Sequence, residues 1–200
     1  MTEPSPAGNT DEFSDGRRAK GERRRRALVE ATLRVIERDG ASGVTHRSVA
    51  GEAGLPTTTP TYYFDGIDGL LTAVLTSCLD EDATRLRLLT DTPGDNVSSR
   101  RALAELMAER VAGRSRLLAE FELCLLAARR PELRDSTDRW AKALAGFARR
   151  HTADPARVEL FVGAYDGLLL RALLADRKPT PDEFEAMLRS LLPDEPGARA

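Results

Sequence analysis

The sequence predicts an all-α protein, and three observations support this prediction. Apolar residues recur at helical spacing in one segment after another of the 200-residue chain. No alternating run of apolar and polar residues is long enough to build a sheet. Helix start and stop signals separate the segments, as at Asp39-Gly40, Asp154-Pro155 and Thr180-Pro181. We expect nine helices, of which the first three are grouped near the N-terminus.

The first three helices are expected before residue 65. The first begins near Lys20 and ends at Asp39-Gly40, the second follows an N-cap at Thr45, and the third runs over about 57–64. Gly54 lies between the second and third helices, where a tight turn needs a positive φ. A helix, a turn and a helix of this length match a helix-turn-helix unit, whose second helix enters the major groove of DNA. Many other αα-hairpins share the pattern, so it does not by itself decide the function.

The other six helices begin near Ile67, Val97, Arg114, Pro131, Pro155 and Pro181. The helix over 155–174 is apolar on nearly all sides, and the last helix has a wide apolar stripe. Together they offer more apolar surface than the core of a single chain needs. Two such helices from each of two subunits would form a four-helix interface, whereas a monomer with a buried last helix is the alternative. The residues expected in a homodimer interface are Phe161, Tyr165, Leu169, Leu173, Phe184, Met187, Leu188 and Leu191.

Composition excludes several classes of protein. Two cysteines 46 positions apart and two histidines argue against a zinc finger, an iron–sulfur cluster or a disulfide scaffold. No nucleophile elbow, P-loop, dinucleotide fingerprint or HExxH motif is present, so we expect no catalytic residue, no metal and no cofactor. The N-terminus has no secretory signal and no segment is suited to a membrane span, which together favour a cytoplasmic protein.

Charge is distributed unevenly along the chain. The net charge is −2, yet residues 16–65 carry ten Lys and Arg against six Asp and Glu, after an acidic stretch over 1–15. Seven of the basic residues fall between Arg17 and Arg26. A basic arm beside a small helical unit suggests contact with phosphates. The alternative is a solvated, disordered tail.

Several stretches together form a more specific pattern. These are VTHRSVAGEAGL over 44–55, Tyr62-Tyr63-Phe64 and GLLTAVL over 69–75, preceded by the apolar and turn positions of the first helix. The pattern, over about residues 23–76, resembles the DNA-binding head of TetR-type (TetR/AcrR) transcriptional regulators. Beyond it the resemblance depends on helix count and length. It implies a homodimer of nine or ten helices per chain that binds DNA and releases it when a small ligand binds.

The resemblance implies roles for individual residues of the head. Thr45 would cap the second helix and contact a phosphate, and Arg47 would reach the DNA backbone or a base edge. The three threonines over 57–59 would begin the recognition helix, and Phe64 would pack in the core. The implied DNA-binding residues are Arg25, Arg26, Thr45, Arg47, Thr57, Thr58, Thr59, Thr61, Tyr62 and Tyr63.

The head departs from the family pattern in three places. Pro60 stands where an apolar residue is usual, and it could delay the start of the helix by a residue or two. Thr61 stands where a tyrosine is usual and has less reach toward a phosphate. The family often has a lysine after Phe64, but Asp65-Gly66-Ile67-Asp68 supplies none, and backbone amides there could hold a phosphate instead.

A ligand cavity is expected among the middle helices, near residues 70–170. Asp166 and Arg171 lie in the most apolar segment, where a buried charge needs a partner; they could pair structurally or contact a ligand. Cys78 and Cys124 are expected to pack in the core, with a thiol sensor as the alternative. The candidate ligand residues, whose types are more often plain core, are Leu75, Cys78, Met107, Phe121, Cys124, Trp140, Phe147, Tyr165 and Asp166.

These observations predict four segments: a disordered acidic tail over 1–18, a helix-turn-helix DNA-binding domain over 19–65, an effector-binding and dimerisation domain over 66–193, and a disordered tail over 194–200. We expect a transcriptional regulator that represses by binding double-stranded DNA at a palindromic operator as a homodimer and is released by a small-molecule effector. The alternative is a constitutive or architectural DNA-binding protein without an effector. An enzyme on an all-α scaffold is a third class, for which the sequence offers no residues.

Overall fold

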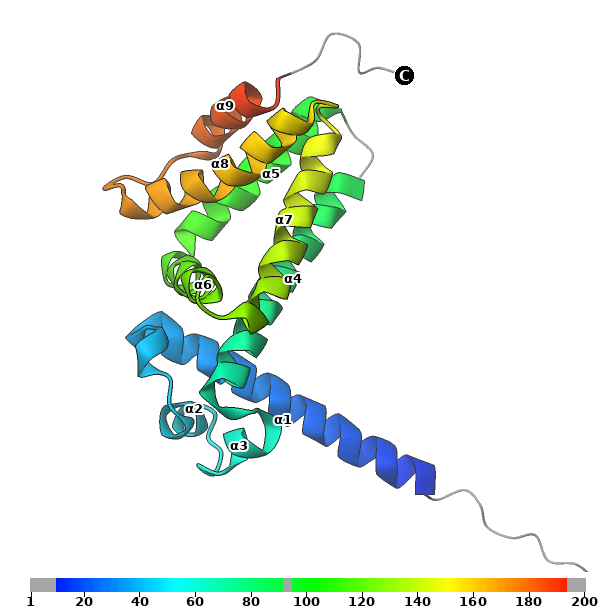
Figure 1. Cartoon of the computed structure of the whole chain (residues 1–200), viewed down its shortest axis with the longest axis vertical. Coiled ribbons are helices and arrows are strands. Elements are labelled where there is room, and N and C mark those ends of the chain that lie inside the picture. Colours follow the sequence, from blue (N-terminus) through cyan, green and yellow to red (C-terminus); the bar gives the residue numbers. More distant parts are fainter. Residues whose placement is uncertain (1–9, 92–94, 194–200) are drawn as a thin grey trace, which may run out of the picture. The chain divides into compact units, whose positions relative to one another are not determined.

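The computed structural model describes residues 10–91 and 95–193, and within these ranges all regular structure is helical (Figure 1). Nine α-helices and two short 3-10 helices are present there, which confirms the all-α prediction. The expected turn over 92–94, the first nine residues and the expected tail over 194–200 lie outside the described residues. The chain divides into two compact units, residues 1–74 and 75–200.

The first unit is built from α1 (Thr10–Asp39), α2 (His46–Glu52), α3 (Thr59–Tyr63) and the beginning of α4 (Gly66–Asp91). A 3-10 turn over Ala41–Gly43 links α1 to α2. The expected boundary after residue 65 differs from the division after Val74, because the first turns of α4 belong to this unit. The core of the unit is made of Leu28, Ala31, Val35, Ile36, Val44, Val49, Ala50, Phe64, Leu70, Leu71 and Val74.

The first helix begins earlier than its sequence pattern indicates. We expected it to begin near Lys20 after a disordered tail, but α1 begins at Thr10, so residues 10–18 are helical. The sequence offers a physical reason, since no proline follows Pro6 before the end of α1 and acidic residues come first, near the positive end of the helix dipole. Apolar periodicity, which the prediction used, begins later.

The second unit contains the rest of α4, α5 (Asn96–Ala112), α6 (Arg114–Ala127), α7 (Arg134–Arg149), α8 (Pro155–Leu174) and α9 (Pro181–Leu191). Helix α5 packs against α9, and α7 packs against α8 (Figure 1). The predicted caps are confirmed: Asp154 accepts from the Ala156 amide at 3.0 Å, and Thr180 and Glu183 form a capping box. Pro131 begins a 3-10 turn over Pro131–Leu133 that precedes α7, instead of α7 itself.

Aromatic side chains from α7 and α8 form the core of the second unit. Phe147 stacks on Phe161 with ring centroids 6.0 Å apart, and Tyr165 meets the edge of Trp140 at 5.7 Å. Six of the eight residues predicted for the dimer interface are buried in the core of their own chain: Phe161, Tyr165, Leu169, Leu173, Phe184 and Leu188. The prediction was wrong for these six, because apolarity on all sides of a helix does not tell which stripe faces its own chain. Met187 is exposed and Leu191 half-buried.

Hydropathy in the described parts of the chain fits this packing. Among the helices over 10–91 and 95–193, none combines the length and the apolar character that a membrane crossing needs.

Candidate nucleic-acid interface and ligand pocket

The turn of the helix-turn-helix unit is fixed by local hydrogen bonds and one glycine. The Ser48 amide donates to Thr45 Oγ1 at 3.0 Å, and the Thr45 amide donates to Ser48 Oγ at 2.9 Å, which closes a capping box at the start of α2. Gly54 has a φ of 64° between α2 and α3, as expected for a tight turn. These features confirm Thr45 as the N-cap of α2.

Ion pairs attach α2 to α1. The Arg34 Nε donates to Glu52 Oε1 at 2.7 Å, and Arg38 Nη1 donates to Glu52 Oε2 at 2.9 Å. The hydrogen bonds from Arg34 and then Arg38 hold the pKa of the Glu52 carboxyl below its usual range. The pairs orient α2 with respect to the helix that carries the basic run.

The departures at Pro60 and Thr61 have local consequences. Pro60 occupies the first turn of α3 and is buried, so α3 begins at Thr59, two residues later than expected. Thr61 Oγ1 donates to the Thr58 carbonyl oxygen at 2.8 Å. The hydroxyl proton of Thr61 is therefore engaged within the chain in this structure.

The largest exposed side chain of the turn region belongs to the end of α3. Tyr62 is 82% exposed, and its ring lies edge-on to Tyr63, with centroids 4.9 Å apart. Phe64 is buried, as expected, and the Arg25 guanidinium stacks over its ring at 5.0 Å. The other predicted DNA-binding residues are exposed (Arg26, Thr45, Arg47, Thr57 and Thr58) or, for Thr59, half-buried. The structure thus places the predicted set on the head, with Arg25 held against the core.

The basic run is part of a helix. Arg18, Lys20, Arg23, Arg24, Arg25 and Arg26 all lie in α1, and all are exposed. We expected this run to be a basic arm that contacts phosphates. Its exposed, helical side chains are compatible with such contacts, which stay a prediction.

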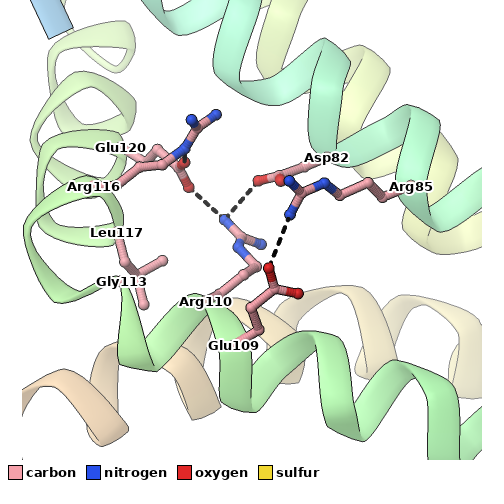
Figure 2. A pocket seen from close by; sticks show the side chains of 8 residues that line it. All are labelled: Asp82, Arg85, Glu109, Arg110, Gly113, Arg116, Leu117 and Glu120. Carbon is pink, nitrogen blue, oxygen red and sulfur yellow. Dashed lines mark hydrogen bonds and ion pairs between the residues drawn. The ribbon is translucent and has the colours of Figure 1, made fainter.

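A pocket of about 160 Å³ opens between α4, α5 and α6 of the second unit (Figure 2). Three acidic and three basic side chains line it, together with one leucine and one glycine. The lining residues are Asp82, Arg85, Glu109, Arg110, Gly113, Arg116, Leu117 and Glu120.

Arg110 of α5 is the centre of this pocket. Its side chain is only 9% exposed, and its Nη2 lies 2.5 Å from Glu120 Oε2 and 3.0 Å from Asp82 Oδ2 (Figure 2). The Nη1 donates to the Tyr165 hydroxyl at 3.3 Å, and the guanidinium lies 5.5 Å from the centroid of the Trp140 ring. One cation is therefore shared by two buried carboxylates in front of an aromatic wall.

Three further ion pairs lie around Arg110. Arg116 bridges Glu120 Oε1 at 3.2 Å and Glu81 Oε2 at 2.7 Å, which confirms the expected i, i+4 pair between Arg116 and Glu120. Arg85 lies 3.8 Å from Glu109, and both are exposed. These ion pairs include exposed side chains, whereas the buried carboxylates of Asp82 and Glu120 lie at the inner end of the pocket.

The sequence did not identify the residues of this pocket. None of the nine predicted ligand residues is among its lining residues, although Trp140 and Tyr165 contact Arg110 from behind. The available signal was a charged residue on a core stripe, since Asp82 lies between Leu79 and Leu86 at helical spacing.

The remaining predicted ligand residues are distributed over several environments. Leu75, Cys78, Met107 and Phe147 are buried core residues, and Phe121 and Cys124 are half-buried. Both Asp166 and Arg171 are exposed residues of α8, so the expected burial is wrong for Arg171. The Asp166 carboxyl is hydrogen-bonded to Trp140, and loss of solvent contact raises its pKa, so the expectation of a partnered acid holds for Asp166. Burial raises the pKa of the Cys78 and Cys124 thiols to about 12, which keeps both protonated at neutral pH and favours the packing role over a thiol sensor.

One side of α8 exposes an apolar stripe. Leu160, Leu170 and Leu174 are exposed, and Leu174 is 77% accessible. Gly163 and Gly167 complete the stripe at three- and four-residue spacing, and a side chain at either glycine would point into open space in the single chain. This spacing and these small residues suit close packing of a second helix.

A helix-turn-helix head followed by a helical unit with a pocket defines a class: DNA-binding regulators that carry a ligand-binding part. Residues 98–194 match the family model described as the tetracyclin repressor-like C-terminal domain. The structure is similar to EbrR, a multidrug binding protein, with 31% identity, a TM-score of 0.71, and coverage of 88% of this chain and 98% of EbrR. It is also similar to the TetR family member SCO1917 of Streptomyces coelicolor A3, with 32% identity, a TM-score of 0.72, and coverage of 85% and 98%. The chain belongs to the TetR family of transcriptional regulators.

Curated relatives match parts of the chain. The nicotine-responsive transcriptional repressor HdnoR of Paenarthrobacter nicotinovorans is 28% identical over 109 residues, which are 54% of this chain and 56% of HdnoR. The chain thus spans about half the length of this relative, and it spans 27% of a second curated relative, a helix-turn-helix regulator. EbrR has been solved in complex with imidazole, ethidium, proflavin and malachite green.

Proposed function

We propose that this chain is a ligand-responsive repressor that binds a palindromic operator as a homodimer and leaves it when a small molecule binds. The observation that carries the proposal is that α4 contributes residues both to the head unit and to the pocket of the second unit. This helix supplies Leu70, Leu71 and Val74 to the core of the head unit and Asp82 and Arg85 to the pocket of the second unit. A ligand that moves α4 in the pocket therefore has a covalent, hydrogen-bonded route to the head.

The DNA-binding part of the proposal rests on the exposed side chains of the head. Arg47 projects from the first turn of α2, and Tyr62 from the last turn of α3. Arg47 supplies a cation, and Tyr62 an aromatic ring with a hydroxyl, which suits contacts with phosphates and base edges in a major groove. Acting on DNA places the protein in the cytoplasm.

The effector part of the proposal is supported by the relatives. EbrR binds several small organic molecules, and HdnoR is a repressor that responds to nicotine. In this chain the pocket around Arg110 is the site we assign to the effector, because it is concave and its polar side chains converge around one buried guanidinium.

The dimer part is supported by the exposed stripe of α8. Two copies of Leu160, Gly163, Gly167, Leu170 and Leu174 can pack against each other about a two-fold axis, with Met187 of α9 beside them. A two-fold axis would place two recognition helices on successive major-groove turns, about 34–36 Å apart, and so requires a palindromic operator.

The test is fluorescence-anisotropy binding of the full chain to duplexes from the DNA flanking its own gene, titrated with salt. Preference for one palindromic duplex over its scrambled version, at one or two dimers per duplex, is the expected result. Equal, weak binding to every duplex with a steep salt dependence would favour the alternative, a constitutive or architectural DNA-binding protein. Absence of binding even at low salt would refute the DNA-binding role.

A further inference from the structure

The inner end of the pocket contains a buried acceptor without a donor. The Asp82 side chain is only 5% exposed. Within the described residues, its Oδ2 accepts no hydrogen bond, although the Arg110 guanidinium lies 3.0 Å away. Buried carboxylate oxygens in folded proteins are nearly always hydrogen-bonded, so a buried oxygen that faces a pocket marks a place for a donor from outside the chain.

In this structure Arg110 forms an ion pair with Asp82 but donates no hydrogen bond to its Oδ2, although the Arg110 Nη2 lies 3.0 Å away. The same Nη2 that approaches Asp82 donates to Glu120 Oε2 at 2.5 Å, and Nη1 is directed to the Tyr165 hydroxyl. Arg116 serves Glu120 Oε1 and Glu81. Two buried carboxylates therefore share one buried guanidinium, and of the two it is Asp82 that lacks a hydrogen bond.

We propose that the pocket recognises its effector through a protonated nitrogen, an ammonium or amidinium group, that donates to Asp82 Oδ2. This inference rests on the proposed function and names the chemical class of the effector at the same site. The cationic group would donate to the Asp82 oxygen that Arg110 approaches at 3.0 Å without a hydrogen bond, and the rest of the molecule would extend toward Leu117 and the pocket mouth.

Charge decides between a cationic and an anionic ligand. The lining residues carry three positive and three negative charges, so the net charge of the pocket favours neither a cationic nor an anionic ligand. At the buried end of the pocket, away from the exposed Arg85, an anion would have to draw Arg110 or Arg116 from its carboxylate and leave a buried acid without its cation, which is costly. A cation removes no existing pair and satisfies the open acceptor.

Burial supports the same choice. Loss of solvent contact raises the pKa of Asp82 to about 6, and the nearby Arg110, Arg116 and Arg85 only partly oppose this effect, while Glu120 adds to it. At pH 7.5 the carboxyl is still ionised, so it attracts a positive group. The pocket volume of about 160 Å³ suits the head of a small molecule better than a large fused ring system.

The test uses three probes of nearly equal shape: benzamidine, which is cationic, benzamide, which is neutral, and benzoate, which is anionic. Binding of each to the full chain is measured by isothermal titration calorimetry at pH 7.5. Benzamidine should bind at least about tenfold more tightly than benzamide or benzoate. Equal affinities, a preference for benzoate, or no heat from benzamidine at millimolar concentration would each overturn the inference.

A substitution localises the effect. Asp82→Asn keeps the shape of the side chain, removes its charge, and should lower benzamidine affinity about tenfold or more. Asp80→Asn is the matched control, since it makes the same change on the same helix at an exposed residue that pairs with Arg139 outside this pocket, and its affinity should equal that of the unmodified chain. Circular dichroism establishes that both variants are folded, and the three-probe comparison on the unmodified chain does not depend on them.

The same preparation separates this inference from the proposed function. If the chain binds a palindromic duplex specifically but shows no preference for benzamidine, only the effector class is refuted. If it binds no duplex while benzamidine binds through Asp82, the repressor role fails and the cation site stands.

Discussion

At the scale of single residues, the buried carboxylate of Asp82 links function to stability. Its pKa is raised from the ordinary value to about 6, mainly by burial. A group whose pKa is higher in the folded than in the unfolded state stabilises fully below the unfolded pKa, near 4, and that contribution is lost as pH rises through about 6. At neutral pH the ionised Asp82 therefore destabilises the protein.

Asp82→Asn should consequently stabilise the chain at pH 7.5 and do so much less at pH 4.5. A shift of about 2 pKa units corresponds to roughly 3 kcal/mol, so a gain of about 1–3 kcal/mol in the free energy of unfolding is expected at the higher pH. Urea denaturation at both pH values measures it. A variant less stable than the unmodified chain at pH 7.5 would show that the ion pair with Arg110 outweighs the cost of burial.

The exposed residues of the head allow a direct test of the DNA contacts. Arg47→Ala and Tyr62→Ala should each weaken operator binding by about 1–3 kcal/mol and leave the dimer intact, because both side chains are exposed and neither belongs to the core. Anisotropy titration gives the affinity and analytical ultracentrifugation the mass. Unchanged affinity in both variants would place the DNA elsewhere on the head.

At the scale of elements, the first helix shows what periodicity detects. The start of α1 was predicted near Lys20 because apolar spacing begins after that point, yet the helix extends back to Thr10. A segment that buries nothing gives no amphipathic signal, and its helical state depends on propensity and on the absence of proline. Caps carried more information: Thr45, Asp154 and Thr180 all cap the helices that the sequence assigned to them.

The basic turns of α1 should strengthen DNA binding without adding specificity. Replacing Arg23, Arg24 and Arg26 by Gln removes three exposed charges from one helix and should flatten the plot of log affinity against log salt by about 0.9 for each phosphate that is no longer neutralised. Discrimination between operator and scrambled duplex should persist. A salt slope equal to that of the unmodified chain would mean that this end of α1 is directed away from DNA.

The site could be predicted only in part, for physical reasons. The spacing of the head allowed residues around the turn to be proposed as DNA contacts, which stays a prediction, and the burial of Phe64 is confirmed. The pocket was missed because it depends on long-range packing between α4, α5 and α6, which brings Asp82, Arg110 and Glu120 together from positions 28 and 10 residues apart. An apolar cavity was expected, but the structure shows an ionic one.

At the scale of the whole molecule, assembly is the next question. The predicted dimer residues were mostly core, and we propose the exposed stripe of α8 as the interface in their place. Leu170→Glu should convert the dimer to a monomer and weaken operator binding strongly, because a charge in the centre of the stripe must be desolvated on pairing. Leu125→Glu, on α6, is the control, since Leu125 is 72% exposed but lies outside the stripe.

Sedimentation equilibrium distinguishes the two variants. Dimeric Leu125→Glu together with monomeric Leu170→Glu is the expected pair of results. A dimer that survives Leu170→Glu would move the interface to another surface, such as α9.

In the proposed mechanism, the length of helix α4 matters. Sixteen positions separate Gly66 from Asp82, which at 1.5 Å per residue is about 24 Å along the helix axis. A tilt of about 5° around Asp82 would displace the far end of the helix by about 2 Å, several times the tolerance of about 0.5 Å within which a positioned contact works. In the proposed dimer the two displacements would act on one stretch of DNA, so a very small adjustment around one carboxylate would be enough to mismatch both heads with their grooves.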